Sequence, residues 1–201
     1  MYRISPLLPE DLFSMDTANL DGLTESFDLF YYLYYLVNHT EDCFFLYTTE
    51  STSFNSFHFK DIQGYVLGKL EEKENICAHL SALSVAPNSR RLGYGKYLLE
   101  ILESNGNHHN AFFADLFVRQ SNLPAIRFYK SLGYDIYRKV LQYYGHLIEN
   151  AYEMRKSLDM DPTKKCMEPG DDIHADEFLK TSHATKIINV VRVFCLQIKL
   201  T

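Results

Sequence analysis

Apolar residues follow two different spacings along this chain, and their succession predicts a mixed α/β domain. Short apolar runs bounded by turn residues predict strands at 2–8, 43–47, 61–70, 79–86, 111–118, 134–144 and 151–157. Apolar residues three or four apart predict helices at 23–37, from Tyr94 onwards, and between Asn122 and Gly133. Acids in the first turn after Pro9 predict that a short helix begins at 9–13. The order β-α-α-β-β-β-α-β-α-β-β indicates an α/β class, with helices packed around one sheet.

Three of the predicted helices carry apolar faces. In 23–37 the aromatic residues are Phe27, Phe30, Tyr31, Tyr34 and Tyr35, and two interpretations stay open. They form the buried face of a core helix, or they also line a groove in which tyrosines offer both an apolar ring and a hydroxyl. The helix after Arg90 has a stripe of Tyr94, Tyr97, Leu98, Ile101 and Leu102, and the helix after Asn122 has Leu123, Ile126 and Phe128.

The strand at 79–86 changes its alternation partway along. Apolar residues fall at Leu80 and Ala82 and then at Leu83 and Val85, so the pattern shifts by one residue. A β-bulge would produce this shift, and so would a strand buried on both faces.

A glycine-containing turn, Arg90-Arg91-Leu92-Gly93-Tyr94-Gly95, joins this strand to the next helix. The first N–H groups of a helix lack internal partners and the helix dipole favours negative charge there, so the turn is a candidate anion site. The dinucleotide fingerprint is excluded because Leu98 stands at its third glycine, and the G-x-x-x-x-G-K-[ST] loop of nucleotide triphosphatases is absent.

Composition narrows the possible functions. The chain has 201 residues and a formal net charge of −6, so it lacks the basic surplus with which a nucleic-acid binder neutralises phosphates. Four scattered cysteines, with no C-x-x-C pair, indicate reduced thiols in the cytosol, and no metal is expected. Neither a signal peptide nor a membrane-spanning segment is visible.

The composition changes after Leu158, which predicts a domain at 1–158 and a tail at 159–201. Residues 159–177 are charged and contain proline and glycine, so we expect a flexible segment. Residues 184–200 are β-branched and apolar, which suits a docking element or an interaction segment.

Two motifs resemble the GCN5-related N-acetyltransferase (GNAT) superfamily. The first is Arg90-x-x-Gly93-x-Gly95, which is similar to the family's acetyl-CoA pyrophosphate loop. The second is Asn122-Leu123-Pro124-Ala125-Ile126-Arg127-Phe128-Tyr129, followed by Leu132-Gly133-Tyr134. The resemblance implies a mixed, mostly antiparallel central sheet flanked by helices, in which a bulge in the 79–86 strand opens a cleft for the thioester.

Residues 1 to about 158 resemble more closely the catalytic subunits of the N-terminal acetyltransferase B (NatB) complex. The similar segments include 10–36, 115–119, 133–138, Tyr143-Tyr144 and 151–156. The resemblance implies acetylation of nascent polypeptides that begin Met-Asp, Met-Glu, Met-Asn or Met-Gln, at the ribosome, in a heterodimer with a large helical-repeat auxiliary subunit. The chain departs from that family at Phe27, usually Tyr, at Ser81, usually Thr, and in having no tryptophan.

The same resemblance assigns roles to individual residues. Acetyl-CoA would be held by Leu83, Val85, Arg90, Arg91, Gly93, Tyr94, Gly95, Lys96, Asn122 and Tyr129. Asn122 and Tyr129 would line the thioester, and the Tyr129 hydroxyl would protonate the leaving thiolate; the alternative is a core tyrosine with a structural hydrogen bond. The substrate peptide would meet Glu25, Phe27, His79, Ser81, Tyr143 and Tyr144.

Two rival functions stay open at this point. The chain could be a GNAT enzyme for a different amine, or an inactive GNAT fold that only binds acetyl-CoA. Intact Arg90, Gly93, Gly95, Asn122 and Tyr129 argue against the second.

Overall fold

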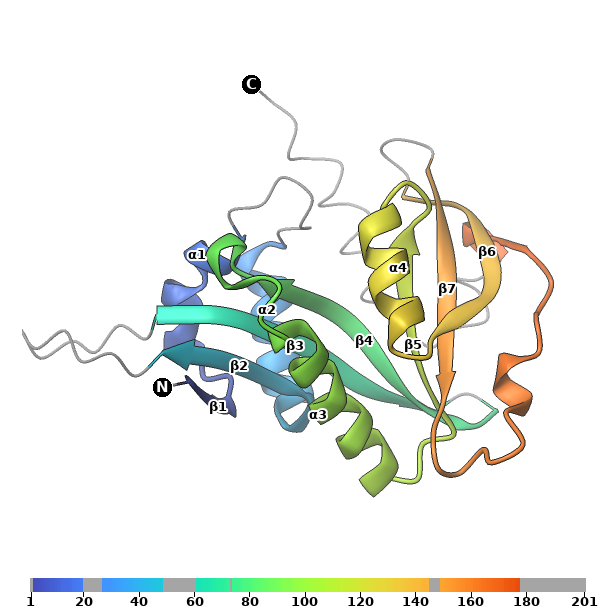
Figure 1. Ribbon diagram of the computed structural model, residues 1–201, viewed down its shortest axis with the longest axis horizontal. Coiled ribbons are helices and arrows are strands. Elements are labelled where there is room, and N and C mark those ends of the chain that lie inside the picture. Colours follow the sequence, from blue (N-terminus) through green and yellow to red (C-terminus); the bar gives the residue numbers. More distant parts are fainter. Residues whose placement is uncertain (1, 20–26, 49–60, 73, 145–148, 178–201) are drawn as a thin grey trace, which may run out of the picture. The chain divides into compact units, whose positions relative to one another are not determined.

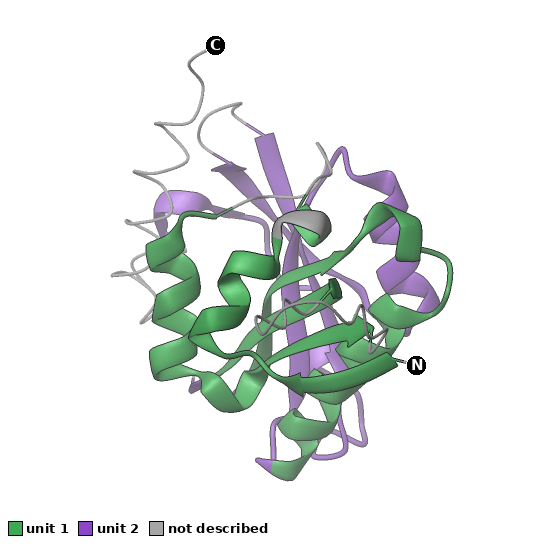
Figure 2. Cartoon of the chain, turned by 90° about the vertical axis from the view of Figure 1, so that its left-hand side faces the viewer, with its two compact units in different colours: residues 1–70, 78–108 green, residues 71–77, 109–201 purple. Residues whose placement is uncertain are grey.

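The computed structural model describes residues 2–19, 27–48, 61–72, 74–144 and 149–177. The chain divides into two compact units, coloured separately in Figure 2. Unit 1 comprises residues 1–70 and 78–108, and unit 2 comprises residues 71–77 and 109–201. The division into these two units does not coincide with the predicted domain boundary at Leu158, and that boundary stays a prediction.

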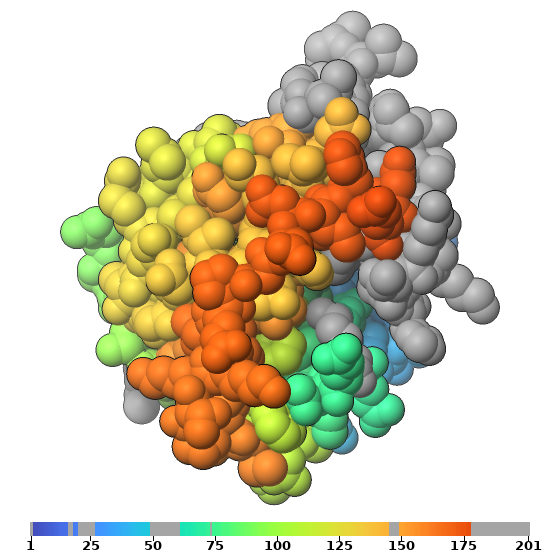
Figure 3. All heavy atoms as spheres, turned by 90° about the vertical axis from the view of Figure 1, so that its right-hand side faces the viewer, coloured from blue at the N-terminus to red at the C-terminus, as the bar shows by residue number. Residues whose placement is uncertain are grey.

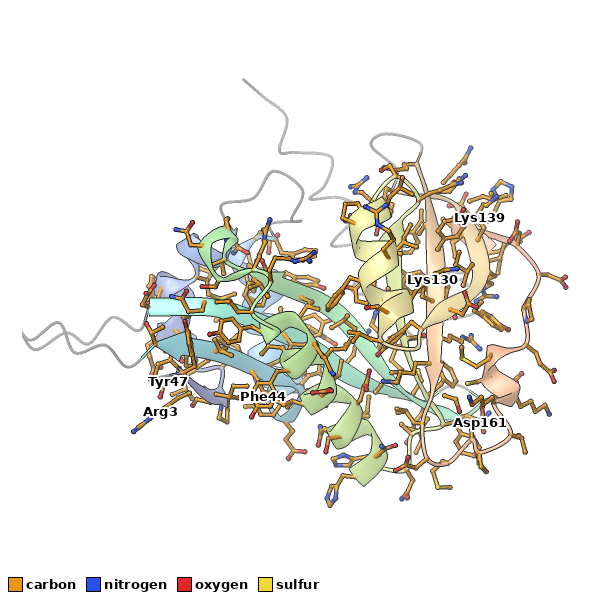
Figure 4. All side chains as sticks on the ribbon, viewed as in Figure 1. Arg3, Phe44, Tyr47, Lys130, Lys139 and Asp161 are labelled. Atoms are coloured by element: carbon orange, nitrogen blue, oxygen red, sulfur yellow. The ribbon has the colours of Figure 1, made fainter. Side chains whose placement is uncertain are left out.

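Unit 1 is built on four neighbouring strands in the order β1-β2-β3-β4 (Figure 1). They are β1 (Tyr2–Pro6), β2 (Cys43–Thr48), β3 (Asp61–Glu72) and β4 (Ile76–Val85). The pairs β1–β2 and β2–β3 are antiparallel, and β2–β3 shifts register between Leu46 and Tyr47. The side chains of Arg3 and Tyr47, partners in the first pair, are labelled in Figure 4.

Two helices of unit 1 pack on opposite faces of β3. Gly64 and Gly68 lie against α3 (Tyr94–His108): a Cβ on Gly68 would come within 2.3 Å of Leu102 Cδ1. Tyr65 points the other way, because side chains alternate along a strand. Its ring meets Tyr32 of α2 (Leu29–Asn38) in an edge contact at 6.1 Å. The missing side chains on β3 therefore let α3 approach the sheet closely.

Among its described residues, unit 1 also contains four short helical segments, three of which precede β3. These three are the 3₁₀ helices η1 (Pro9–Ser14) and η2 (Thr40–Asp42) and the single-turn helix α1 (Asp16–Asn19). A third 3₁₀ turn, η3 (Pro87–Ser89), follows β4 and leads towards α3.

Unit 2 contains strands in the order β5-β7-β6-β8. They are β5 (Phe113–Arg119), β7 (Glu149–Ser157), β6 (Asp135–Tyr144) and β8 (Ile173–His174). β7 is antiparallel to both β5 and β6, so the predicted strands at 134–144 and 151–157 form a hairpin, whereas β8 is parallel to β6. The helix α4 (Leu123–Ser131) joins β5 to β6. The described pairs are thus mixed and mostly antiparallel, as predicted.

The helix faces differ in part from the sequence prediction. Among the described residues α2 begins at Leu29, capped by Asp28, whose carboxylate accepts from the Tyr31 N–H at 2.7 Å. Tyr31 and Tyr35 are buried as expected, but Phe30 is 72% exposed. Tyr97 and Leu123 are also more than half exposed, so their assignment to buried stripes is wrong. Helical spacing shows which residues share a side of a helix, but it does not show which residues at the margin of that side are exposed to solvent.

The segment after Leu158 corrects a second expectation. Residues 159–177 do not run free of unit 2: they form the 3₁₀ turn η4 (Lys165–Met167) and β8, and Asp161 and Ala175 are buried. Charge and proline content predicted flexibility, but backbone pairing to β6 supplies contacts that composition does not reveal. Residues 178–201, including the apolar run predicted to dock, lie outside the described residues.

The described cysteines are free thiols, with Cys43 and Cys77 buried and Cys166 partly exposed, and Cys195 lies beyond residue 177. Within the described ranges, none of the helices has the length and apolarity needed to cross a bilayer.

Candidate active site

The turn between β4 and α3 has the backbone geometry of an anion site. Arg91 and Gly93 adopt left-handed conformations, with φ of 65° and 86°. The Gly93 carbonyl accepts the Tyr97 N–H at 3.0 Å, which closes the first turn of α3. The amides of Tyr94, Gly95 and Lys96 therefore stand at the helix N-terminus, where N–H groups have no intrahelical acceptor. This arrangement suits a phosphate, as predicted from the sequence.

Open space surrounds Gly93. A Cβ built at this position would have no heavy atom within 4 Å. The glycine is needed here for its positive φ, since most residues avoid that conformation. The space above it leaves the backbone accessible to a ligand.

The charged residues of the turn are on the surface. Arg90 and Arg91 are exposed, and Arg90 Nε donates to the Val85 carbonyl at 3.0 Å, which ties the turn to the end of β4. Lys96 Nζ lies 3.6 Å from the Glu100 carboxylate, one helical turn along α3. These cations add positive charge where the helix dipole is already positive.

Tyr94 has a neighbour that sequence reasoning missed. The Tyr2 ring of β1 lies 4.5 Å from the Tyr94 ring, between centroids. Desolvation, with a smaller contribution from the Tyr2 hydroxyl, raises the pKa of Tyr94 to about 12. The Tyr94 hydroxyl is therefore a neutral donor at physiological pH. No motif links Tyr2 to this turn, because the two residues are far apart in the sequence and meet through a ring contact between β1 and the start of α3.

Leu83 and Val85 lie in the second half of β4 and are half-buried, whereas Ser84 between them is buried. The Ser84 hydroxyl donates to the Ala18 carbonyl at 2.5 Å, so this side chain faces α1. Leu83 and Val85 consequently share the opposite side of the strand. Their backbone role toward the cofactor and the bulge in β4 stay predictions.

Phe27 and Ser81, two candidate peptide-binding residues, are linked through tyrosines of α2. Phe27 stacks on Tyr31 at 4.0 Å with an interplanar angle of 17°, and Tyr31 contacts Tyr35 at 4.9 Å. The Tyr35 hydroxyl then donates to Ser81 Oγ at 2.5 Å. The Ser81 hydroxyl thus accepts from Tyr35 and keeps its own hydrogen for another acceptor. Burial of Tyr31 and Tyr35 confirms the core-helix interpretation, whereas the groove stays a prediction.

His79 lies two residues before Ser81 on β4. Residues two apart on a strand share one face, so the imidazole and the Ser81 hydroxyl lie on the same side. Both residues are partly accessible. Glu25, the remaining candidate from the first half of the chain, falls outside the described residues.

Asn122 caps α4, as the sequence predicts. Its side-chain oxygen accepts the Ala125 N–H at 3.2 Å, and Pro124 occupies the first turn. Because the oxygen is committed to the cap, the amide nitrogen is the group that this side chain can offer to a ligand.

Tyr129 lies on the last turns of α4 and is half-buried. Its ring makes edge contacts with Phe128 at 5.3 Å and Tyr134 at 5.9 Å. Burial raises the pKa of its hydroxyl well above the ordinary value. The group is therefore protonated at neutral pH and can act as a proton donor, not as a base.

Tyr143 and Tyr144 end β6 and are held by different neighbours. Tyr143 stacks on Phe117 at 4.8 Å, with an interplanar angle of 16°. The guanidinium of Arg119 lies 3.9 Å above the Tyr144 ring, a cation–π geometry.

Glu149, at the start of β7, completes this corner of unit 2 and was not singled out from the sequence. Its carboxylate accepts from Arg119 Nη1 at 2.9 Å and from both the N–H and the hydroxyl of Ser121. The bond from the Ser121 side chain, followed by the contacts with the Ser121 backbone and Arg119, outweighs desolvation and lowers the pKa of Glu149. The carboxylate thus ties the hairpin to the residue that precedes Asn122. Its pairing with Arg119 across β5 and β7 could not be read from local sequence.

The candidate residues therefore form two groups. The group in unit 1 contains the glycine turn and the strand supported by Tyr35, and the group in unit 2 contains the Tyr129 hydroxyl and the amide of Asn122, which caps α4. Within the described ranges, no cluster of three or more His, Cys, Asp or Glu side chains could hold a metal. The chemistry on offer is hydrogen bonding, anion binding and proton donation, as acyl transfer between a thioester and an amine requires.

Comparison with known proteins agrees with this chemistry. Residues 15–134 match the model of the acetyltransferase (GNAT) family. The chain therefore belongs to the GNAT acetyltransferase family, and it is an acyltransferase with the fold of that family.

Within the family, the similarity is to one kind of catalytic subunit. The chain is 42% identical over 159 residues to the N-terminal acetyltransferase B complex catalytic subunit naa20 of Schizosaccharomyces pombe, covering 77% of this chain and 84% of that protein. The crystal structure of Chaetomium thermophilum Naa20 with a bisubstrate analogue matches with a TM-score of 0.75 and 32% identity, over 87% of this chain and 97% of that one. A NatB acetyltransferase complex bound to CoA and MES matches with a TM-score of 0.66 and 31% identity, over 78% of this chain and 99% of that one.

Proposed function

We propose that this chain is the catalytic subunit of an N-terminal acetyltransferase that transfers acetyl from acetyl-CoA to the α-amine of nascent polypeptides beginning Met-Asp, Met-Glu, Met-Asn or Met-Gln. The 42% identity to a NatB catalytic subunit over 159 residues carries the proposal. The site supports it, since each step of the reaction finds a suitable group among the described residues.

Cofactor binding would use the backbone of unit 1. The amides from Arg91 to Lys96 would hold the pyrophosphate, and Gly93 leaves the open space that a close approach needs. Backbone groups of Leu83 and Val85 would pair with the pantetheine arm as an added strand does.

Proton transfer would use unit 2. A free α-amine has a pKa of about 8, so a useful neutral fraction exists without a strong base. When the amine attacks the thioester carbonyl, the amide nitrogen of Asn122 can donate toward the cofactor. Collapse of the intermediate breaks the C–S bond, and the Tyr129 hydroxyl gives its proton to the leaving thiolate. The proton that the attacking nitrogen loses on becoming an amide restores the hydroxyl, so no net proton is gained or lost. The raised pKa of Tyr129 keeps that proton in place at neutral pH.

Substrate selection would use donors and an apolar slot. Aspartate, glutamate, asparagine and glutamine share a side-chain oxygen that accepts hydrogen bonds, so the pocket needs donors. His79, Ser81 and the hydroxyls of Tyr143 and Tyr144 are the candidates, while Phe27, stacked on Tyr31, suits the initiating methionine. Glu25 stays a prediction.

An exposed apolar stripe on α2 supports a partner subunit. Phe30 and Val37 are 72% and 78% exposed, and they lie seven residues apart on one side of the helix. Isolated apolar residues on a surface are ordinary, but a row of them on one helix favours an interface. We assign this stripe to the auxiliary subunit. Association with the ribosome, and action in the cytosol where nascent chains emerge, are parts of the same proposal.

The test is an acetylation assay on peptides beginning Met-Asp, Met-Leu and Ser and on a peptide with an internal lysine, with and without the auxiliary subunit. We expect the Met-Asp peptide to be the preferred substrate of the heterodimer. Equal rates with Met-Leu or Ser peptides would reject the NatB specificity. A Phe30→Asp, Val37→Asp double variant should lose co-purification with the partner while still binding acetyl-CoA.

A further inference from the structure

Residues 158–175, here called the strap, follow β7 and are tied down at both ends within unit 2. Figure 3 shows this orange segment crossing one face of the unit. At its start the Asp161 carboxylate accepts the N–H groups of Lys165 at 3.0 Å and Cys166 at 2.9 Å. Asp161 is only 5% exposed, and Figure 4 places it at the opposite end of the strap from Lys139.

The far end of the strap is bonded along β6. The Gly170 N–H donates to the Tyr137 carbonyl at 2.9 Å, and the Lys139 N–H donates to the Asp172 carboxylate at 2.8 Å. Ile173 then pairs with Val140 as the first residue of β8. The strap thus follows β6 toward Tyr143 and Tyr144.

β6 becomes irregular where the strap ends. Val140 pairs with Ala151 and Tyr144 pairs with Glu149, so residues 141–143 of β6 lie opposite the single residue Asn150. Gln142 has a φ of 56°, and its N–H donates to Asn150 Oδ1 at 3.0 Å. Bulges of this kind redirect side chains, and here they set the direction of Tyr143 and Tyr144.

The strap and the two tyrosines share one apolar cluster. Its buried members are Val140, Ala151 and Ala175, and the side chains packed against them are Phe117, Tyr143, Tyr144 and Ile173. Val140 pairs with Ile173 of the strap, and it is also the last residue of β6 before the bulge. The backbone is irregular here, because Gln142 is left-handed and residues 141–143 lie opposite the single residue Asn150. Such a backbone persists only when the surrounding structure stabilises it.

We propose that Ile173 is a positioning residue for peptide recognition: the strap holds the bulge of β6 and so sets the orientation of Tyr143 and Tyr144. The assignment of those tyrosines to the peptide rests on the proposed function. Ile173 is not among the residues assigned to the peptide or the cofactor, and it packs on the Val140 cluster. Its loss should therefore act on peptide binding through the hairpin and leave acetyl-CoA binding intact.

The test compares Ile173→Ala with Ile136→Ala in the full-length chain with its auxiliary subunit. Ile136 is a half-buried isoleucine at the other end of β6, paired with Met154, so the same side chain is removed away from the bulge. We expect Ile173→Ala to raise the KM for a Met-Asp peptide about tenfold, within the range that misplacement produces. kcat and the KM for acetyl-CoA should stay within about twofold, Ile136→Ala should leave the peptide KM unchanged, and Ile173→Val should restore it.

Amide hydrogen exchange provides a readout that does not depend on activity. Exchange at Gln142, Tyr143 and Tyr144 should become faster in Ile173→Ala and not in Ile136→Ala. If Ile173→Ala does not fold, Asp172→Ala, which removes only the acceptor for the Lys139 N–H, is expected to show the same pattern more weakly.

The outcomes separate the two proposals. Wild-type protein that acetylates none of the peptides refutes the proposed function, and hydrogen exchange still decides whether the strap holds the bulge. Unchanged exchange in Ile173→Ala overturns the strap proposal. Faster exchange with an unchanged peptide KM overturns its role in recognition.

Discussion

Two regions are proposed to bind ligands, and they differ in the groups that they offer. One is the turn before α3 in unit 1, and the other is the corner formed by α4 and the β6–β7 hairpin in unit 2. The turn uses backbone: two left-handed residues, a helix N-terminus and open space above Gly93. The corner uses side chains: the capping amide of Asn122, the protonated hydroxyl of Tyr129, and two tyrosines held by Phe117 and Arg119. A backbone site should be damaged by changes of shape, and a side-chain site by loss of a single polar atom.

The largest effect should come from removing one atom in unit 2. Tyr129→Phe deletes the hydroxyl while keeping the ring contacts, and general acid catalysis contributes about 10²–10⁴-fold. We expect single-turnover rates to fall by that range with little change in acetyl-CoA affinity measured by calorimetry. Tyr134→Phe is the matched control on the neighbouring ring. Turnover near the wild-type rate in Tyr129→Phe, with chemistry rate-limiting, would give Tyr129 a structural role only.

A change of shape should dominate in unit 1. Gly93→Val forces a branched residue into positive φ and places its side chain where the pyrophosphate approaches, so acetyl-CoA should bind at least about tenfold more weakly. Gly133→Val is the control, because Gly133 has a φ of 93° and a Cβ there would meet only Lys156 at 3.7 Å. Calorimetry should show lower stability in both variants and lower affinity only in Gly93→Val. A folded Gly93→Val protein with wild-type affinity would remove the turn from the cofactor site.

A variant of His79 tests whether peptide binding in unit 1 also depends on a single polar side chain. His79→Ala removes one donor from the proposed pocket, and a hydrogen bond contributes about 1 kcal/mol net, or roughly fivefold. The KM for Met-Asp peptides should rise by that factor, and their advantage over Met-Leu peptides should shrink. Steady-state assays with both peptides measure this. An equal change for both would mean that His79 supports the strand without reading the second residue.

The smallest effect concerns Glu149 and is a matter of stability. Its pKa is lowered in the folded state, so its stabilising contribution is complete above the unfolded pKa of about 4.3 and disappears as pH falls through the folded value. Glu149→Gln should therefore lower Tm slightly at pH 7, and the difference from wild type should vanish near pH 2. Since the pair is partly exposed, the shift should be small. A difference that persists at acid pH would assign the effect to geometry and not to charge.

Local patterns in the sequence determined a large part of this protein. Strands β1 to β7, α4 with its Asn122 cap and the glycine turn follow from short-range rules, because spacing and capping act within a few residues. The two motifs then indicated a family that the comparisons confirm.

Tertiary structure alone decided which of these elements meet. Tyr2 of β1 reaches Tyr94 of α3 through a ring contact, and Glu149 reaches Arg119 across the paired strands β5 and β7. Both pairs of residues are far apart in the chain. The Tyr35 hydroxyl of α2 donates to Ser81 of β4. α2 packs on one face of the sheet, and α3 packs on the other face, against Gly64 and Gly68. The strap shows the same limit most plainly: its charged composition predicted a flexible segment, and only the backbone of β6, with its unused hydrogen-bonding edge, could determine that it docks. Backbone pairing of this kind leaves little trace in the residues that perform it.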